Sequence, residues 1–184
     1  ENIKTFVKEG GVLVCNKGSS NFAIDEFRLP FKNAMSGLKS EEFMCPGSIL
    51  KLNYKTDNPL AYGLPENGMA YFSRGIAFEF EDETAKPAAK KAAPSKKAAS
   101  GSDNPPEKKA PAKKYVQAKA KVDYKVVAEY PDESLLLSGW ILGDELLRNK
   151  SAVLDVDFEK GKLILFGFNV HNRAQSYLTF KLLF

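Results

Sequence analysis

The chain has 184 residues, of which 43% are hydrophobic and 11% aromatic, so it can bury the core of one folded domain and is not a wholly disordered protein. It is too short for two full-sized enzyme domains. The net charge is +4, and no apolar run approaches the roughly 20 residues of a membrane-spanning helix, so no membrane span is predicted.

The first 80 residues predict an α/β arrangement. An amphipathic helix, which the chain enters partway along, leads through Gly10-Gly11 into an apolar run over residues 12–15, typical of a parallel strand buried on both faces. Ser19 or Ser20 is expected to cap a short helix that ends before Pro30. Alternation over residues 50–54 predicts a half-exposed strand, and residues 76–80 predict another.

Residues 84–114 differ from the rest of the chain. They contain 9 Lys, 9 Ala and 5 Pro, with a local net charge of +7, whereas all other residues together carry −3. Without aromatic, Val, Ile or Leu residues this segment cannot build a core, and its prolines interrupt any helix. We expect a disordered insertion that divides one α/β domain into two parts, residues 1–83 and 115–184.

The lysines of this insertion suggest one alternative function. A polybasic arm can bind nucleic acid or another polyanion by neutralising phosphates. No aromatic residue is interleaved to stack on bases, and the remaining chain is acidic. The composition therefore favours a solvated spacer over a nucleic-acid-binding arm.

The second half predicts further strands and a C-terminal helix. Strands are expected over residues 122–130 and 134–137, followed by a short helix over 143–148. The apolar runs 152–158 and 162–168, joined by a tight turn, predict a hairpin. Residues 174–184 predict a helix with Tyr177, Phe180, Leu183 and Phe184 on one face, which the chain leaves at its last residue, so we expect both ends to be cuts through structure.

The chain lacks the residues of a zinc site. It has one histidine, His171, and two cysteines, Cys15 and Cys45, which stand 30 positions apart without the close spacing that a zinc site needs. Their spacing does not establish a disulfide between them. We therefore expect no metal site within this chain.

A Cys-His hydrolase is a second alternative. Cys15 ends a predicted strand and His171 follows another, as in class I glutamine amidotransferase-like folds. A strained nucleophile turn needs small residues two positions before and after the cysteine, where this chain has Leu13 and Lys17. Arg173 stands where an acid would orient the histidine. These departures favour a buried structural cysteine.

The loop after the last strand holds the densest polar cluster of the folded part, comprising His171, Asn172, Arg173 and Gln175. It lies between a strand end and a helix start, where α/β sheets bind ligands. The sequence predicts a ligand-binding or interface loop here, and loop polarity with helix capping is the simpler alternative.

Several blocks resemble the C-terminal region of bacterial zinc carboxypeptidase-like proteins of the metallocarboxypeptidase family. These blocks are residues 36–50, 58–65, 138–143, 165–168, 171–175 and 179–184. The resemblance covers the chain apart from the Lys-Ala-Pro segment, and Gly139-Trp140 and the final Phe-Lys-Leu-Leu-Phe are its most specific parts.

In that family a zinc peptidase domain precedes a glutamine amidotransferase-like domain of flavodoxin-like fold. The resemblance implies that this chain is the non-catalytic accessory domain, packed against the peptidase domain of an exported, periplasmic or extracellular protein. The parent protein would hydrolyse peptides with zinc held by an H-x-x-E motif upstream, a motif that this chain does not contain. No catalytic or metal-binding residue is carried over.

Overall fold

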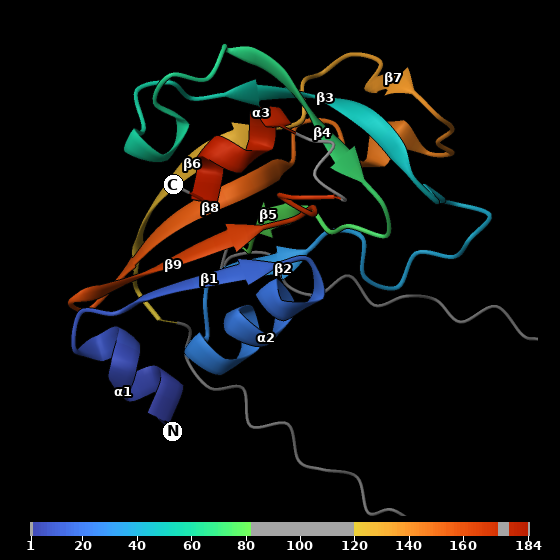
Figure 1. Cartoon of the computed structure of the whole chain (residues 1–184). Coiled ribbons are helices and arrows are strands. Elements are labelled where there is room, and N and C mark those ends of the chain that lie inside the picture. Colours follow the sequence, from blue (N-terminus) through green and yellow to red (C-terminus); the bar gives the residue numbers. More distant parts are fainter. Residues whose placement is uncertain (1, 82–119, 173–176, 184) are drawn as a thin grey trace, which may run out of the picture.

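The computed structural model describes residues 2–81, 120–172 and 177–183 (Figure 1). The predicted insertion over 84–114 and the loop residues Arg173 and Gln175 lie outside the described residues. The described residues form a mixed α/β structure around one nine-stranded sheet, which confirms the predicted class. No helix among them is long and apolar enough to cross a membrane.

Most of the predicted elements are present in the structure. In chain order the observed elements are α1 (Asn2–Lys8), β1 (Val12–Asn16), α2 (Gly18–Phe27), β2 (Phe31–Asn33), β3 (Ser48–Tyr54), the 3-10 helix η1 (Pro59–Ala61), β4 (Asn67–Phe72), β5 (Phe78–Phe80), β6 (Asp123–Glu129), β7 (Leu136–Ser138), the 3-10 helix η2 (Asp144–Leu146), β8 (Ser151–Phe158), β9 (Gly161–Phe166), α3 (Tyr177–Phe180) and the 3-10 helix η3 (Lys181–Leu183). Of these, β2, β4 and the 3-10 helix η1 were not predicted.

The main path of the sheet runs β1-β9-β8-β6-β3-β4, with β2, β5 and β7 attached beside it. Strands β1 and β9 are parallel, and every other pairing between the described strands is antiparallel. The predicted hairpin is confirmed as β8 and β9, which close at the pair Phe158 and Gly161. This largely antiparallel sheet shows the α/β class without establishing a flavodoxin-like topology.

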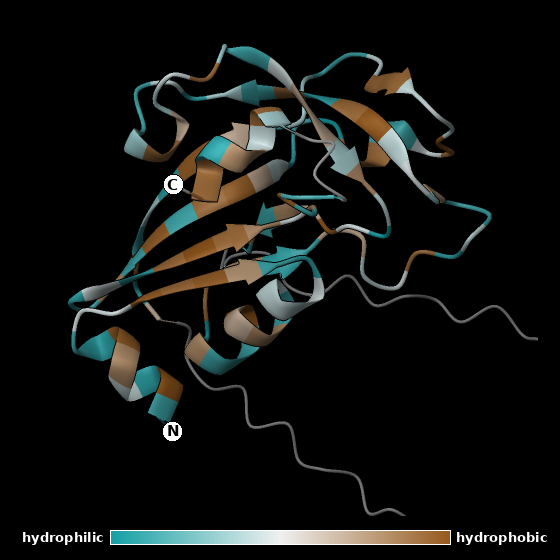
Figure 2. Ribbon diagram, in the orientation of Figure 1, coloured by the Kyte–Doolittle hydropathy of each residue, from teal (hydrophilic) through white to brown (hydrophobic). Residues whose placement is uncertain are grey.

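Strand β9 separates two hydrophobic cores. Leu163 and Leu165 pack in a core that also contains residues of α1 and α2. Ile164 and Phe166, which alternate with them, pack in a second core with residues of β3, β4 and β6 and Leu182 of η3. Figure 1 shows α1 and α2 beside β1, and Figure 2 shows that the central strands are hydrophobic.

The prediction that the first strand is buried on both faces is wrong. Val12 and Val14 of β1 are 52% and 45% exposed, whereas Cys15 is buried. Among the described strands β1 is the end of the sheet path and pairs with β9 alone, so one of its faces lacks a covering layer. The strand buried on both faces is its neighbour β9.

The start of α2 also differs from the prediction. The helix begins at Gly18, and its N-cap residue Lys17 makes no side-chain capping bond. Ser20 is buried inside the first turn, and its hydroxyl donates to the carbonyls of Cys15 and Phe166 at 3.2 and 3.1 Å. Ser20 therefore joins the helix to the ends of β1 and β9 and does not cap it.

The predicted helix over 143–148 is shorter than expected, since residues 144–146 form only a 3-10 turn. The described part of the predicted C-terminal helix, residues 177–183, is helical as α3 followed by η3. The described buried positions of the C-terminal segment are Thr179 and Leu182, whereas Tyr177 is 75% exposed. The apolar face predicted for this helix is therefore not the face that packs on the sheet.

The α2–β2 turn holds the backbone on both sides of residues 82–119. The Glu81 N–H donates to the carbonyl of Pro30, and the Ala120 N–H donates to the carbonyl of Arg28, each at 2.8 Å. The turn itself forms because Arg28 adopts a left-handed conformation, φ 54°, and Pro30 cannot continue the helix. The chain thus leaves and re-enters the described structure at this one turn.

Candidate functional site

Cys15, the candidate nucleophile, lies in the core beneath α2. Its side chain is 4% exposed and packs with Ala23 and Leu165. Burial raises the pKa of the Cys15 thiol, although a hydrogen bond with Ser19 acts in the opposite direction. An activated cysteine needs a lowered pKa and access to substrate. Cys15 has the environment of a structural thiol.

His171 is exposed beyond the end of β9. The residues around it, Phe168 and Val170, pack in the second core, on the other face of β9 from Cys15. No contact between described residues joins Cys15 to His171. Cys15 and Cys45 are both buried and form no disulfide with each other, and they lie in different cores.

Asn172, the other described residue of the predicted loop, borders a small apolar hollow. The hollow has a volume of about 270 Å³ and lies beside the edge strand β4. Its remaining lining residues are Ile49, Met69, Ala70, Tyr71, Tyr177 and Leu178. The loop is thus next to a surface that could hold a small aromatic or aliphatic group, which is consistent with the ligand-binding prediction without testing it.

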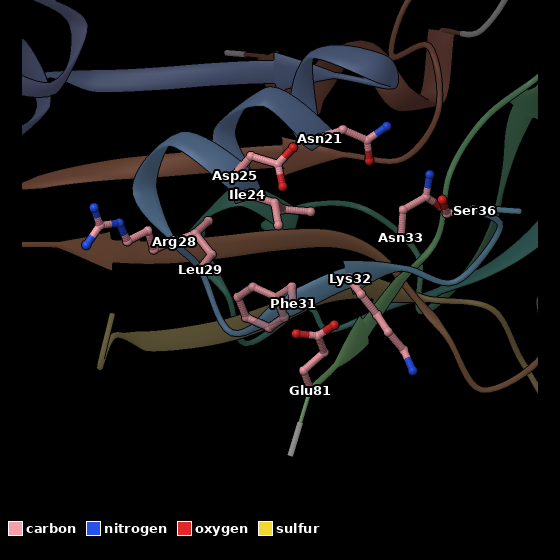
Figure 3. A pocket seen from close by; sticks show the side chains of 10 residues that line it. All are labelled: Asn21, Ile24, Asp25, Arg28, Leu29, Phe31, Lys32, Asn33, Ser36 and Glu81. Carbon is pink, nitrogen blue, oxygen red and sulfur yellow. The ribbon is translucent and has the colours of Figure 1, made fainter. Parts of the chain in front are cut away.

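A larger cavity lies elsewhere, between α2 and β2, and has a volume of about 740 Å³ (Figure 3). Ligand sites in proteins usually have volumes of roughly 300 to 1,000 Å³. Four lining residues come from α2 and its end, three from β2, and the others from the flanking segments. They are Asn21, Ile24, Asp25, Arg28, Leu29, Phe31, Lys32, Asn33, Ser36 and Glu81.

The floor of this α2–β2 cleft is apolar and rigid. Ile24, Leu29 and Phe31 are all buried in the core under α2. The Phe31 ring packs edge-on against the rings of Phe80 and Tyr124, with centroid separations of 5.9 and 4.9 Å. The floor is therefore held in place by the sheet itself.

The walls of the cleft carry polar groups. The carboxylate of Asp25 points into the opening, whereas the guanidinium of Arg28 extends away from it (Figure 3). The Lys32 ammonium is paired with Glu79 at 3.1 Å, and Glu79 also binds Lys150 at 2.8 Å. Hydrogen bonding from Lys150, assisted by Lys32, lowers the pKa of the Glu79 carboxyl. Asp25 is thus the carboxylate of α2 that a ligand can reach.

Sequence reasoning missed this cleft. Asn21 and Asp25 stand four positions apart on a short helix, a pattern equally typical of a solvated face. Asn21 and Asp25 line a cleft only because β2 and Glu81 lie opposite them in the fold. No cluster of His, Cys, Asp and Glu able to hold a metal ion occurs among the described residues.

Comparisons with known proteins leave the family of the chain open. No protein-family model, no curated protein and no solved structure matches it.

Proposed function

We propose that the chain is a non-catalytic accessory domain, of the amidotransferase-like and flavodoxin-like type, in an exported zinc carboxypeptidase-like protein. In this proposal the zinc and the hydrolysis of peptides belong to a separate domain, and this chain packs against that domain. The sequence blocks that resemble the family support it. The parallel pair β1 and β9, with α1 and α2 packed together against it, is the part of the fold that agrees with a flavodoxin-like domain.

The observation that carries the proposal is an exposed apolar surface around Trp140, in one of the two most specific of those blocks. Trp140 is 50% exposed, and Met44 and Leu142, which pair with each other through both backbone hydrogen bonds, are 41% and 40% exposed. We call these three residues the Trp140 surface. Grouped exposed apolar side chains of this kind mark protein interaction sites.

The glycines of this block have structural reasons that do not apply to Trp140. Gly139 and Gly143 have φ values of 101° and 75°, and an added Cβ would lie 2.6 Å from the Ser48 hydroxyl and 2.2 Å from the Glu42 carbonyl, respectively. Folding therefore explains the two glycines. It does not explain an exposed indole, which favours a binding role for Trp140.

The first experiment tests whether the chain is catalytic. The purified 184-residue chain is assayed for bound zinc and for release of C-terminal residues from peptides with zinc added. We expect no stoichiometric zinc and no hydrolysis. One equivalent of tightly held zinc, or turnover that a chelator abolishes, would contradict the proposal.

The second experiment tests the packing role. The gene is read upstream for a zinc carboxypeptidase domain, and that domain is produced separately and titrated with this chain. We expect Trp140→Ala to weaken binding at least tenfold, a loss typical of an aromatic hot spot. The control is Tyr62→Ala, since Tyr62 is an 82% exposed aromatic residue outside the surface. Absence of a peptidase domain, or equal effects of the two variants, would overturn the proposal.

A further inference from the structure

We propose that the α2–β2 cleft binds an extended peptide, which pairs with the free edge of β2 and places a Lys or Arg side chain against Asp25. This inference goes beyond the accessory role and does not depend on it. It rests on the backbone of β2, on the charges of the walls and on the apolar floor.

Among the described strands, β2 pairs only with β5 and so has one free edge. In its antiparallel pairing with β5, the Glu81 N–H donates to the Pro30 carbonyl at 2.8 Å and the Ala34 N–H to the Ala77 carbonyl at 2.9 Å. Because bonding direction alternates along a strand, Phe31 and Asn33 direct their backbone groups away from β5. Both residues line the cleft, so β2 presents its unpaired edge there.

Only one of these backbone groups of Phe31 and Asn33 has a hydrogen-bond partner within the described residues. The Asn33 carbonyl accepts a bond from the Ser36 N–H at 3.1 Å. Within the described part of the chain, the N–H and C=O of Phe31 and the N–H of Asn33 have no hydrogen-bond partner. Unpaired groups on a strand edge are a template for pairing with another chain, so this edge suits an added strand.

The α2 wall of the cleft carries an uncompensated carboxylate, Asp25. Asn21 and Asp25 lie one turn apart on α2, and no partner for either side chain exists among the described residues. Lys32 pairs with Glu79, which it shares with Lys150, and the Arg28 guanidinium points away from the opening. Asp25 is therefore the carboxylate of the cleft wall that a cationic side chain can reach.

The apolar floor of the cleft can accept the aliphatic stem of the ligand side chain. Ile24, Leu29 and Phe31 form an apolar floor beside Asp25. Lys and Arg combine a long aliphatic stem with a charged end, so they can cover this floor while their charge reaches Asp25. Together the edge, the charge and the floor specify a basic residue in an extended peptide.

The experiment titrates the isotope-labelled full chain with acetyl-Thr-Val-Lys-Val-Thr-amide and follows backbone amides by NMR. We expect saturable shifts and slower hydrogen exchange at Phe31 and Asn33. Replacing the peptide lysine by glutamate is expected to weaken binding about tenfold or more, since charge-assisted hydrogen bonds are among the strongest polar contacts. Saturation without changes at these two amides would overturn the proposal, as would no binding.

Variants test the role of Asp25. Asp25→Asn is expected to weaken binding of the lysine peptide about five- to tenfold and to leave the glutamate peptide no weaker. Glu26→Gln is the matched control, because Glu26 lies next to Asp25 but pairs with Lys4 at 2.9 Å, away from the cleft. Equal effects of the two variants would refute the charge assignment. The amide spectrum of each free variant verifies folding.

Modified peptides test the strand pairing. In an added strand only alternate peptide N–H groups face β2, so N-methylation is expected to abolish binding at one of two adjacent positions and to be tolerated at the other. Equal tolerance of both methyl groups would exclude strand addition.

The chain's own lysines over residues 84–114 provide a competing occupant. A variant lacking these residues is expected to bind the peptide with unchanged affinity. At least tenfold tighter binding would assign the cleft to those lysines and overturn the proposal of an external peptide. None of these results bears on zinc content or on Trp140→Ala, so this inference and the accessory role can fail separately.

Discussion

Strands β1 and β9 run side by side and in parallel, and their sequences carry similar apolar runs, yet only β9 is buried on both faces. β9 has a neighbour on each side and a core on each face. β1 has one neighbour and one covered face among the described residues. An apolar run thus specifies a strand, whereas the burial of that strand depends on which elements surround it.

The largest expected effect comes from comparing the loss of the same two methyl groups at a fully buried position and at a half-exposed position of the sheet. Val156→Ala, in β8 beside β9, is expected to lower the free energy of unfolding by about 2 kcal/mol, because Val156 is fully buried. Val14→Ala in β1 is expected to lower it by less than about 0.5 kcal/mol. Urea denaturation measures both, and equal losses would mean that the exposed face of β1 is covered in solution.

Thiol reactivity distinguishes the two faces of β1. Burial raises the pKa of Cys15, so the unreactive thiol predominates at neutral pH. We expect iodoacetamide to modify Cys15 at least about tenfold more slowly than a cysteine placed on the exposed face by Val14→Cys. Mass spectrometry of the modified residues gives both rates. Rapid, selective reaction of Cys15 would revive the hydrolase alternative.

The elements that sequence reasoning found are those with a strong local pattern. The alternation over 50–54 predicted β3, whose residues alternate between buried and half-buried, and the turn after Phe158 predicted the β8–β9 hairpin. The side of the sheet that each strand occupies was not predictable in this way. It depends on contacts between distant segments, such as β5 with β8.

The candidate sites show the same limit. His171 and Asn172 stand out in the sequence because polar residues gather around them, and Asn172 does border a hollow. The larger cleft joins α2 to Glu81, which are separated by more than 50 residues. Its main feature is the free edge of β2, a property of pairing that no residue type reveals.

A smaller effect is expected from the hydroxyl that links the two strands. Ser20→Ala removes the bonds to the carbonyls of Cys15 and Phe166 and is expected to lower the free energy of unfolding by about 1 kcal/mol. Ser19→Ala is the control, because the Ser19 hydroxyl bonds to the exposed backbone of Asn16 at 2.8 Å and to the Cys15 thiol, and so does not join β1 to β9. A loss at Ser19 that matches the loss at Ser20 would contradict the assigned linking role.

The smallest effect extends the comparison to the β2–β5 pair. Hydrogen bonds from Lys150 and Lys32 lower the pKa of Glu79, so its contribution to stability is present above the pKa of an unfolded glutamate, roughly 4.3, and is lost as the pH falls through the lower folded value. Because the Glu79 side chain is 37% exposed, solvent screening limits the contribution to under about 1 kcal/mol.

Glu79→Gln is therefore expected to reduce the melting temperature slightly at pH 7 and to converge with the unmodified chain once the pH falls below the folded pKa of Glu79. Glu133→Gln serves as the control, since Glu133 is 60% exposed and pairs with Lys51 alone among the described residues. A difference that persists or grows in acid would show that the Glu79 carboxylate does not act through its charge.

The anchoring of Glu81 and Ala120 on Pro30 and Arg28 has a consequence for engineering. The chain departs and returns within one turn, so the folded part fixes both ends of whatever sequence lies between. The entropy cost of closing such a loop grows only with the logarithm of its length. This junction is therefore the place to insert a reporter domain, or to open new termini by circular permutation, with little effect on the sheet.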